Sequence, residues 1–153
     1  RWIVAIFYVF SFIFSIIVNV KRGHFRVYFI YLSHLSLAVT MFTTIFSAIL
    51  VSFYHFAVIK ASKRVLSVYW AMFNISIVFS CVVSVCYWTL LFKGESTDLY
   101  DIIIHVTNSA VMFIDLLIVK HPPKYFYFVH ILLAHFAYLL FTVIFQFLGG
   151  LDK

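Results

Sequence analysis

Long apolar segments alternate with short charged clusters along the whole chain. The apolar segments are continuous and lack the strict alternation of a half-buried strand, and most reach the roughly 20 helical residues that cross a bilayer. Open sheet edges cannot face lipid, which also disfavours strands. The pattern therefore predicts an all-α fold, a polytopic membrane helix bundle with five spans at residues 2–20, 27–50, 65–92, 99–119 and 125–148.

The second apolar segment has the least distinct boundaries. No charged residue interrupts it between Arg26 and Lys60, which is too long for one simple crossing. We expect its last third, Val51 to Ile59, to tilt or to extend along the membrane interface. We also expect segments 21–26 and 93–98 to lie on the same side of the membrane, because two crossings separate them.

The composition excludes a water-soluble domain. Hydrophobic residues make up 65% of the 153 residues and charged residues 10%, whereas soluble domains have about 45–50% and 25%. Two Cys and two Pro exclude a disulfide framework, and the net charge of +6 bears on topology. We expect a single transmembrane helical domain over 1–153, in the plasma membrane or the endoplasmic reticulum, with membrane lipids and no nucleic acid as partners.

Polar side chains inside the spans are the candidate functional groups, because burying them is costly unless they are partnered. In the fourth span they share one helical face, at His105, Asn108, Ser109, Met112 and Asp115. In the second span a 3-4-3-4 spacing forms one seam of small hydroxylated residues, which are also the usual material of close helix packing in membranes. The seam consists of Ser33, Ser36, Thr40, Thr43 and Ser47.

Ser33 and His105 are predicted at the same depth. They follow Arg26 and Asp98 by seven residues on parallel spans, which places both roughly 10 Å inside one membrane face. A hydroxyl and an imidazole at equal depth on inward faces are what a nucleophile and its general base require. Asp101 would hold the imidazole in its productive tautomer. Two alternatives stay open: a dipole-favoured carboxylate at Asp101, and a structural hydrogen bond at His105.

Other chemistries find little support in the sequence. No Lys lies inside a span, which excludes a retinal Schiff base. His130 and His135 are separated by about 140° around a helix and do not converge on a metal. We expect no cofactor and no metal. Packing alone does not explain Asp115, for which a proton relay, an ion site and a hydrogen-bonded partner in the third span are all open.

Four strings carry a resemblance to a known family. HVTNSAVMFIDLLIVKHP at residues 105–122 and AYLLFTVIFQFLGG at 137–150 resemble the Rolling stone branch of the androgen-induced membrane protein family. Weaker similarity extends to YFIYLSHLSL at 28–37 and YWTLLF at 87–92. Because members of this family continue past the Gly-Gly pair, the resemblance implies a further span in the full-length protein.

The resemblance implies two alternative functions. The androgen-induced members are similar to intramembrane hydrolases that cleave fatty acid esters of hydroxy fatty acids with a Thr and a His, whereas Rolling stone itself is known for a role in myoblast fusion. The family's His falls on His105 and its Thr on Ser33, which keeps the hydroxyl. We therefore expect a lipid-ester hydrolase with Ser33 and His105 as catalytic residues and Asn108 or Asp101 as orienting or oxyanion group. The alternative is a non-catalytic multi-pass protein of cell fusion or adhesion, and the sequence names no protein partner.

Overall fold

The computed structural model describes residues 1–56, 62–92, 94, 98–119 and 126–149, and this part of the chain is helical without a strand. The predicted all-α bundle is therefore confirmed. Its α-helices are α1 (Trp2–Lys21), α2 (Leu32–His55), α3 (Lys63–Cys86), α4 (Leu99–Asp101), α5 (Asn108–Ile118) and α6 (Phe126–Phe147). Between them lie the 3-10 helix η1 (Phe25–Ile30) and the π-helical segments η2 (Tyr87–Leu91) and η3 (Ile102–Thr107).

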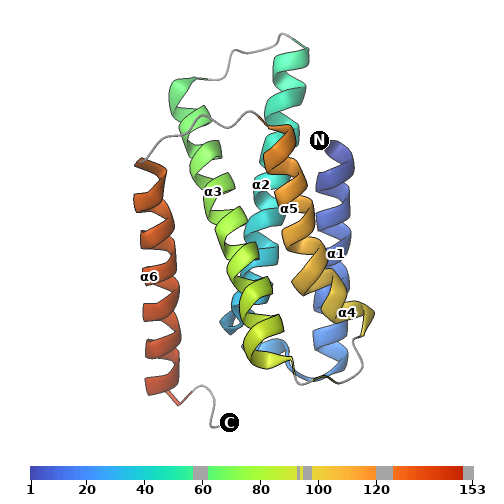
Figure 1. The fold of residues 1–153 in the computed structure, drawn as a ribbon, viewed down its shortest axis with the longest axis vertical. Coiled ribbons are helices and arrows are strands. Elements are labelled where there is room, and N and C mark those ends of the chain that lie inside the picture. Colours follow the sequence, from blue (N-terminus) through green and yellow to red (C-terminus); the bar gives the residue numbers. More distant parts are fainter. Residues whose placement is uncertain (57–61, 93, 95–97, 120–125, 150–153) are drawn as a thin grey trace.

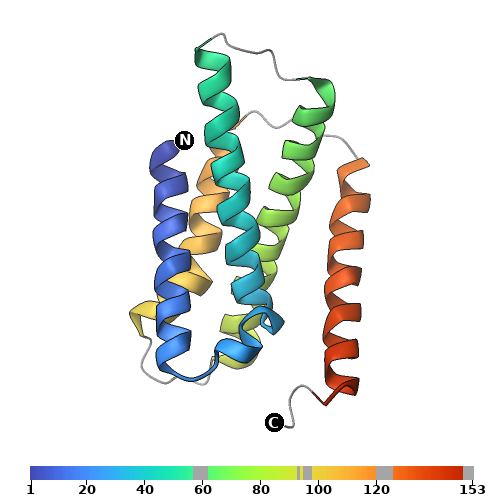
Figure 2. The same cartoon turned by 180° about the vertical axis from the view of Figure 1, so that it is seen from behind.

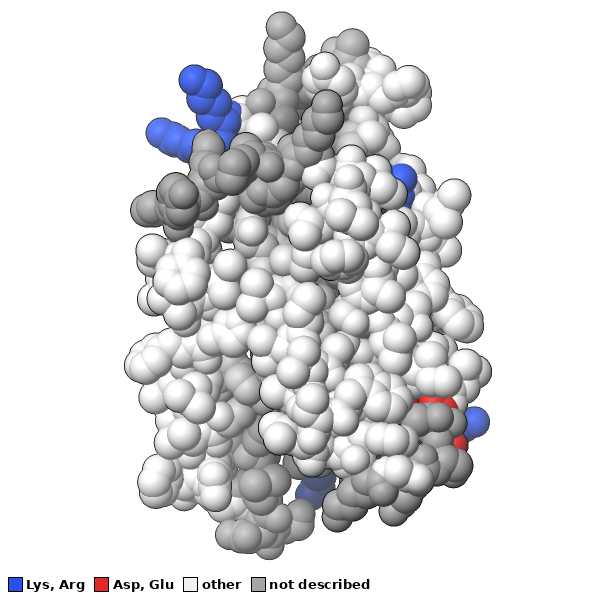
Figure 3. Space-filling model, in the orientation of Figure 1, with Lys and Arg blue, Asp and Glu red and all other residues white. Residues whose placement is uncertain are grey.

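Five helical stretches are long and apolar enough to cross a membrane, as predicted. On the face drawn in Figure 3, charged side chains lie toward the two ends and the wide middle carries none. This distribution fits a protein whose middle faces lipid and whose ends face water. The stretches are Trp2–Lys21, Leu32–His55, Lys63–Leu91, Leu99–Ile118 and Tyr127–Phe147.

Helices α1, α2, α3 and α5 pack around one core, and α6 lies to one side against α3 (Figures 1 and 2). No residue in the most apolar window of α6 is buried inside the protein. One tie between α6 and the bundle is the Tyr138 hydroxyl, which donates to the Ile30 carbonyl at 2.8 Å. The core contains Tyr8, Leu37, Met41, Tyr69, Phe73, Ile104 and Met112.

The second crossing begins at Leu32 rather than at residue 27. Residues 25–30 form η1 instead, and Tyr31 has an extended backbone with φ −79° and ψ 123°. Tyr28 accounts for the break, because its hydroxyl donates to Ser15 of α1 at 2.9 Å and its carbonyl accepts from His34 of α2. No charge separates η1 from α2, so the apolar pattern does not mark this boundary.

At its other end α2 continues as a regular helix to His55, five residues beyond the predicted end of the span. Val51 and the residues up to 55 therefore prolong the crossing helix. The remainder of the predicted interfacial extension, residues 57–59, lies outside the described residues.

The end of α1 and the start of α4 lie together, which places Arg22 and Asp98 of the two predicted segments at the same end of the bundle, while residues 93 and 95–97 lie outside the described residues. Arg22 Nη2 approaches Asp98 Oδ2 at 3.4 Å. Both side chains are exposed, so the pair adds little to stability. Gly23 terminates α1 with a φ of 75°, a conformation that favours glycine over residues with a Cβ atom.

Candidate functional site

The elements that carry the four predicted site residues meet toward one end of the bundle, where α1 ends and α2 begins (Figure 1). Ser33 is the second residue of α2, Asp101 closes α4, His105 lies within η3 and Asn108 opens α5. We call this region the histidine end and define it by Asn19, His34, Tyr87, Tyr100 and His105.

A contact between α2 and α5 agrees with the predicted match in depth. Asn108 Nδ2 donates to Ser36 Oγ at 3.2 Å. Ser33 precedes Ser36 by three residues, and His105 precedes Asn108 by three, so Ser33 and His105 lie at similar heights on neighbouring helices.

Ser33 and His105 do not form a hydrogen bond with each other in this structure. Ser33 is half-buried, whereas His34 beside it is 6% exposed and points inward. The other four members of the predicted hydroxyl seam are all buried. Packing explains part of that seam, because Thr43 and Ser76 of α3 share a hydrogen bond of 2.8 Å.

His105 is held by its ring face and by its backbone. Its imidazole stacks on the Tyr87 ring with centroids 3.7 Å apart and an interplanar angle of 5°. Its carbonyl accepts a hydrogen bond from the Ser84 hydroxyl. Both rings belong to π-helical segments, which are rare and frequently occur at functional sites.

One nitrogen of His105 has no hydrogen-bond partner among the described residues. This atom is Nδ1, and it is buried. A buried nitrogen without a partner is unusual in a folded protein and calls for an explanation. The ring stack fixes the imidazole, and its Nδ1 atom keeps a hydrogen-bonding capacity that no described residue uses.

The Asp101 carboxylate interacts with the phenol of Tyr87. It therefore supports the ring on which His105 stacks, and no described hydrogen bond joins it to the His105 imidazole itself. A direct carboxylate–imidazole pair of the kind found in catalytic triads is absent between these two described residues.

Asn108 ties three helices together in the core. It is 1% exposed, its amide donates to Ser36 of α2, and its carbonyl accepts from the Tyr8 hydroxyl of α1 at 2.9 Å. Its side-chain oxygen Oδ1 is buried without a described partner. The structure thus places Asn108 one turn deeper than His105, in contact with Ser36 and not with Ser33.

His34 is the centre of the polar network at this end, and sequence analysis does not single it out. Its Nδ1–H donates to the Tyr28 carbonyl at 2.9 Å, which leaves Nε2 to accept from the Tyr100 hydroxyl at 2.6 Å. Asn19 Nδ2 donates to the Tyr100 oxygen at 2.6 Å and to the Ser15 carbonyl at 2.9 Å. These bonds fix a neutral tautomer of His34.

Tyr28 and Tyr100 are further held by contacts of their rings. The Tyr28 ring stacks on His34 at 4.1 Å, and burial raises its pKa to about 12. The Arg22 guanidinium lies 4.9 Å from the centre of the Tyr100 ring, within the range of a cation–π contact. The signal that could have revealed His34 and Asn19 is their polarity within apolar spans.

Asp115 lies on the opposite side of the bundle core, toward the other end. It is 6% exposed and pairs with Arg1, so its partner is the residue that precedes α1 and not a residue of the third span. Arg1 and Asn19 are separated by the length of α1, about 27 Å at 1.5 Å per residue. Asp115 therefore does not belong to the histidine end.

The described residues include no group of three His, Cys, Asp or Glu side chains placed to hold a metal ion. The histidine end instead offers a hydroxyl, a free imidazole nitrogen and a hydrogen-bonded His–Tyr pair. These groups suit proton transfer and nucleophilic chemistry.

Comparison with known proteins gives one consistent result. The family model described as Protein rolling stone matches residues 1–153. The chain is 28% identical over 169 aligned residues to Protein rolling stone of Drosophila melanogaster. That alignment covers all of this chain and 60% of the relative, so the chain spans less than two thirds of the relative's length. No solved structure matches the chain.

Proposed function

This chain belongs to the Rolling stone family, and we propose that it is an intramembrane hydrolase of lipid esters, with fatty acid esters of hydroxy fatty acids or similar molecules as substrates. The observation that supports the proposal is the buried, unpartnered Nδ1 of His105 at the height of the Ser33 hydroxyl. The multi-pass protein would act in the plasma membrane or the endoplasmic reticulum.

In this proposal Ser33 is the nucleophile and His105 the general base. Ser33 Oγ attacks the ester carbonyl while its proton moves to the His105 imidazole, which then protonates the departing alcohol. Water hydrolyses the acyl-enzyme with the same imidazole as base. The two groups are not bonded in the resting structure, but catalytic hydrogen bonds often tighten only when substrate is bound.

The start of α2 provides a second supporting feature. Ser33 is the second residue of α2. The backbone N–H groups of His34 and Leu35 donate to the Tyr31 carbonyl, whereas no described hydrogen bond uses those of Leu32 and Ser33. Such groups stabilise the negative oxygen of a tetrahedral intermediate. This backbone role replaces the oxyanion role predicted for Asn108, whose amide is already engaged with Ser36.

Lipid has direct lateral access to this region. Leu90 and Leu91 of η2 are 75% and 66% exposed, and Ile102 and Val106 of η3 are also exposed. An acyl chain dissolved in the bilayer could therefore approach His105 without passing through water.

The test is hydrolysis by purified, full-length protein in nanodiscs. We expect Ser33→Ala and His105→Ala each to lower the rate by at least about 100-fold, with little further loss in the double variant, because a nucleophile and its base act as a unit. Ser33→Thr should retain activity, since the hydroxyl survives. A fluorophosphonate should label Ser33 in the wild type only.

Matched controls are Ser67→Ala, an exposed serine of α3, and His135→Ala, a half-buried histidine of α6 that bonds its own helix. Both should keep full activity. Folded protein that neither reacts with the probe nor hydrolyses hydroxy fatty acid esters would refute the proposal.

That outcome would favour the second candidate, a non-catalytic membrane protein acting in cell fusion or adhesion. The missing hydrogen bond between Ser33 and His105 argues against catalysis in the resting structure. A cell–cell fusion assay separates the two functions, because a fusion role independent of catalysis should survive His105→Ala.

A further inference from the structure

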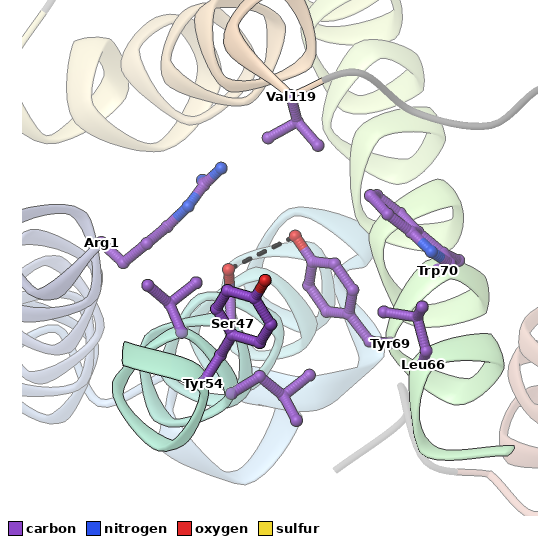
Figure 4. Close-up of a pocket in the computed structure, with 9 residues that line it drawn as sticks. Arg1, Ser47, Tyr54, Leu66, Tyr69, Trp70 and Val119 are labelled. Carbon is purple, nitrogen blue, oxygen red and sulfur yellow. Dashed lines mark hydrogen bonds between the residues drawn. The ribbon is translucent and has the colours of Figure 1, made fainter. Parts of the chain in front are cut away.

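A cavity of about 510 Å³ lies at the end of the bundle opposite the histidine end. It is bordered by α1, α2, α3 and the end of α5, and its walls include Arg1, Ser47, Leu50, Tyr69 and Val119 (Figure 4). The volume falls within the 300–1,000 Å³ typical of small-molecule sites. We call this region the cavity end.

Several polar side chains border the cavity. Arg1 and Tyr69 reach into it from opposite sides (Figure 4), and Ser47 Oγ donates to the Tyr69 hydroxyl at 3.3 Å. That bond leaves the Tyr69 hydroxyl hydrogen able to donate to a guest molecule. Arg1 uses part of its guanidinium to pair with Asp115, and a guanidinium carries five N–H donors.

The remaining wall is apolar. Leu50, Val51, Leu66 and Val119 line it together with the Trp70 ring. This combination of a few convergent donors and a hydrocarbon wall is typical of sites for amphiphilic molecules.

The balance of charge between Arg1 and Asp115 favours a neutral ligand. The Arg1 guanidinium is already compensated by the Asp115 carboxylate. A fatty acid anion would add an uncompensated negative charge near a buried carboxylate, which is costly away from water. A head group with hydroxyls adds no charge, and its oxygens can accept from Arg1 and Tyr69 while one of its hydroxyls donates to Ser47 Oγ.

The position of the cavity suits a lipid that enters from the membrane interface. Trp2 and Tyr54 flank this end and are 51% and 79% exposed. Trp and Tyr are enriched where the bilayer meets water. On their helices Ser47 and Tyr69 lie three residues farther from this end than Leu50 and Leu66, so a lipid would place its head group inward and its chain along the outer, apolar wall.

We propose that the cavity end binds a neutral, single-chain lipid of the monoacylglycerol class. The glycerol head contacts Arg1, Ser47 and Tyr69, and the acyl chain lies along Leu50, Leu66 and Val119. This site is separate from the proposed hydrolytic site, which lies about 27 Å away along α1, and it does not depend on that activity.

The experiment uses full-length protein in nanodiscs with a monooleoylglycerol analogue that carries a diazirine in its chain. We expect the label to map to cavity residues, and unmodified monooleoylglycerol to compete for it. Leu50→Trp fills the cavity and should lower labelling roughly tenfold. Leu139→Trp, on the exposed face of α6, is the matched control and should label like the wild type.

Val119→Phe provides a second cavity-filling variant if Leu50→Trp does not fold. Labelling that persists in a folded cavity-filling variant, or that maps only to exposed α6 residues, would overturn the proposal. Competition by oleate equal to that by monooleoylglycerol would overturn the choice of a neutral head group. Labelling should be unchanged in His105→Ala, because the two sites are separate.

Discussion

The two ends of the bundle use polar groups in opposite ways. At the histidine end, His34, Tyr100 and Asn19 bond to one another at distances of 2.6–3.3 Å, and His105 stacks on Tyr87. At the cavity end, Arg1 and other polar residues border a space of about 510 Å³. At the histidine end the polar side chains are fixed by contacts with one another, whereas at the cavity end they border an open cavity.

The backbone differs in the same way. Both π-helical segments, η2 and η3, lie at the histidine end, whereas α2 and α5 reach the cavity end as regular α-helices. A π-helical turn is rare and departs from the optimal backbone geometry. Its presence in two neighbouring spans, each supplying one ring of the Tyr87–His105 stack, indicates that the backbone adapts to place these rings. The difference favours chemistry at one end and ligand binding at the other.

Replacing the central histidine of the polar network should give the largest loss of stability. His34→Leu leaves the Tyr28 carbonyl, the Tyr100 hydroxyl and Asn19 without their shared partner. Each buried group that loses its hydrogen bond costs about 1–3 kcal/mol, so we expect a loss of about 3 kcal/mol. Steric trapping in bicelles measures the free energy of unfolding.

The matched control for that measurement is His135→Leu. His135 bonds only the Ile131 carbonyl of its own helix and lies edge-on to Phe79, so its replacement should cost less than about 1 kcal/mol. Equal losses in the two variants would mean that the histidine end is not the more tightly constrained region.

The ion pair beside the cavity should give a smaller effect. Asp115→Leu leaves Arg1 without its partner, but Arg1 is 22% exposed and can reach water. We expect a loss of about 2 kcal/mol, below the 3–5 kcal/mol of a fully buried pair. Asp115→Asn should cost about half as much, because the amide oxygen still accepts a hydrogen bond.

A double variant decides whether the pair itself is responsible. Adding Arg1→Met to Asp115→Leu removes the stranded charge, and stability should recover by about 1 kcal/mol. If the double variant instead loses the sum of the two single losses in free energy of unfolding, Arg1 and Asp115 act independently. The Arg1 guanidinium would then be a cation that Asp115 does not compensate.

The sequence predicts the architecture well because apolar length and charge clusters decide which segments cross a bilayer. Five helices long and apolar enough to cross a membrane, the interior position of Asp115 and the proximity of Arg22 to Asp98 all follow from that pattern. The start of α2 does not, because Tyr28 and His34 set it through a hydrogen bond between neighbouring elements.

The candidate site is predicted less completely for a similar reason. Spacing along a helix gives the height of a residue but not the rotation of one helix against another. Ser33 and His105 therefore have the expected heights, while the inward position beside Ser33 belongs to His34. The π-helical backbone around His105 shifts side chains away from the angular positions that a regular α-helix would give them. The pattern of residues in the sequence does not predict this π-helical segment.

The smallest effect expected at neutral pH is that of Tyr28→Phe, which removes one hydroxyl and its bond to Ser15. We expect a loss of about 1 kcal/mol. Tyr54→Phe, at an exposed position of the cavity end, should leave stability unchanged.

The pH dependence of stability makes the comparison between the wild type and Tyr28→Phe sharper. Burial, opposed by the Ser15 hydrogen bond and reinforced by nearby Tyr100, raises the pKa of Tyr28 from 10.0 to about 12. The folded state therefore keeps this proton between pH 10 and 12 while the unfolded chain loses it. The contribution of Tyr28 is fully present below pH 10 and disappears as the pH rises through 12. The wild type should lose stability more steeply than Tyr28→Phe across this interval, so the gap between them narrows. Parallel curves from pH 10 to 12 would show that the Tyr28 hydroxyl ionises as readily in the folded protein as in the unfolded chain.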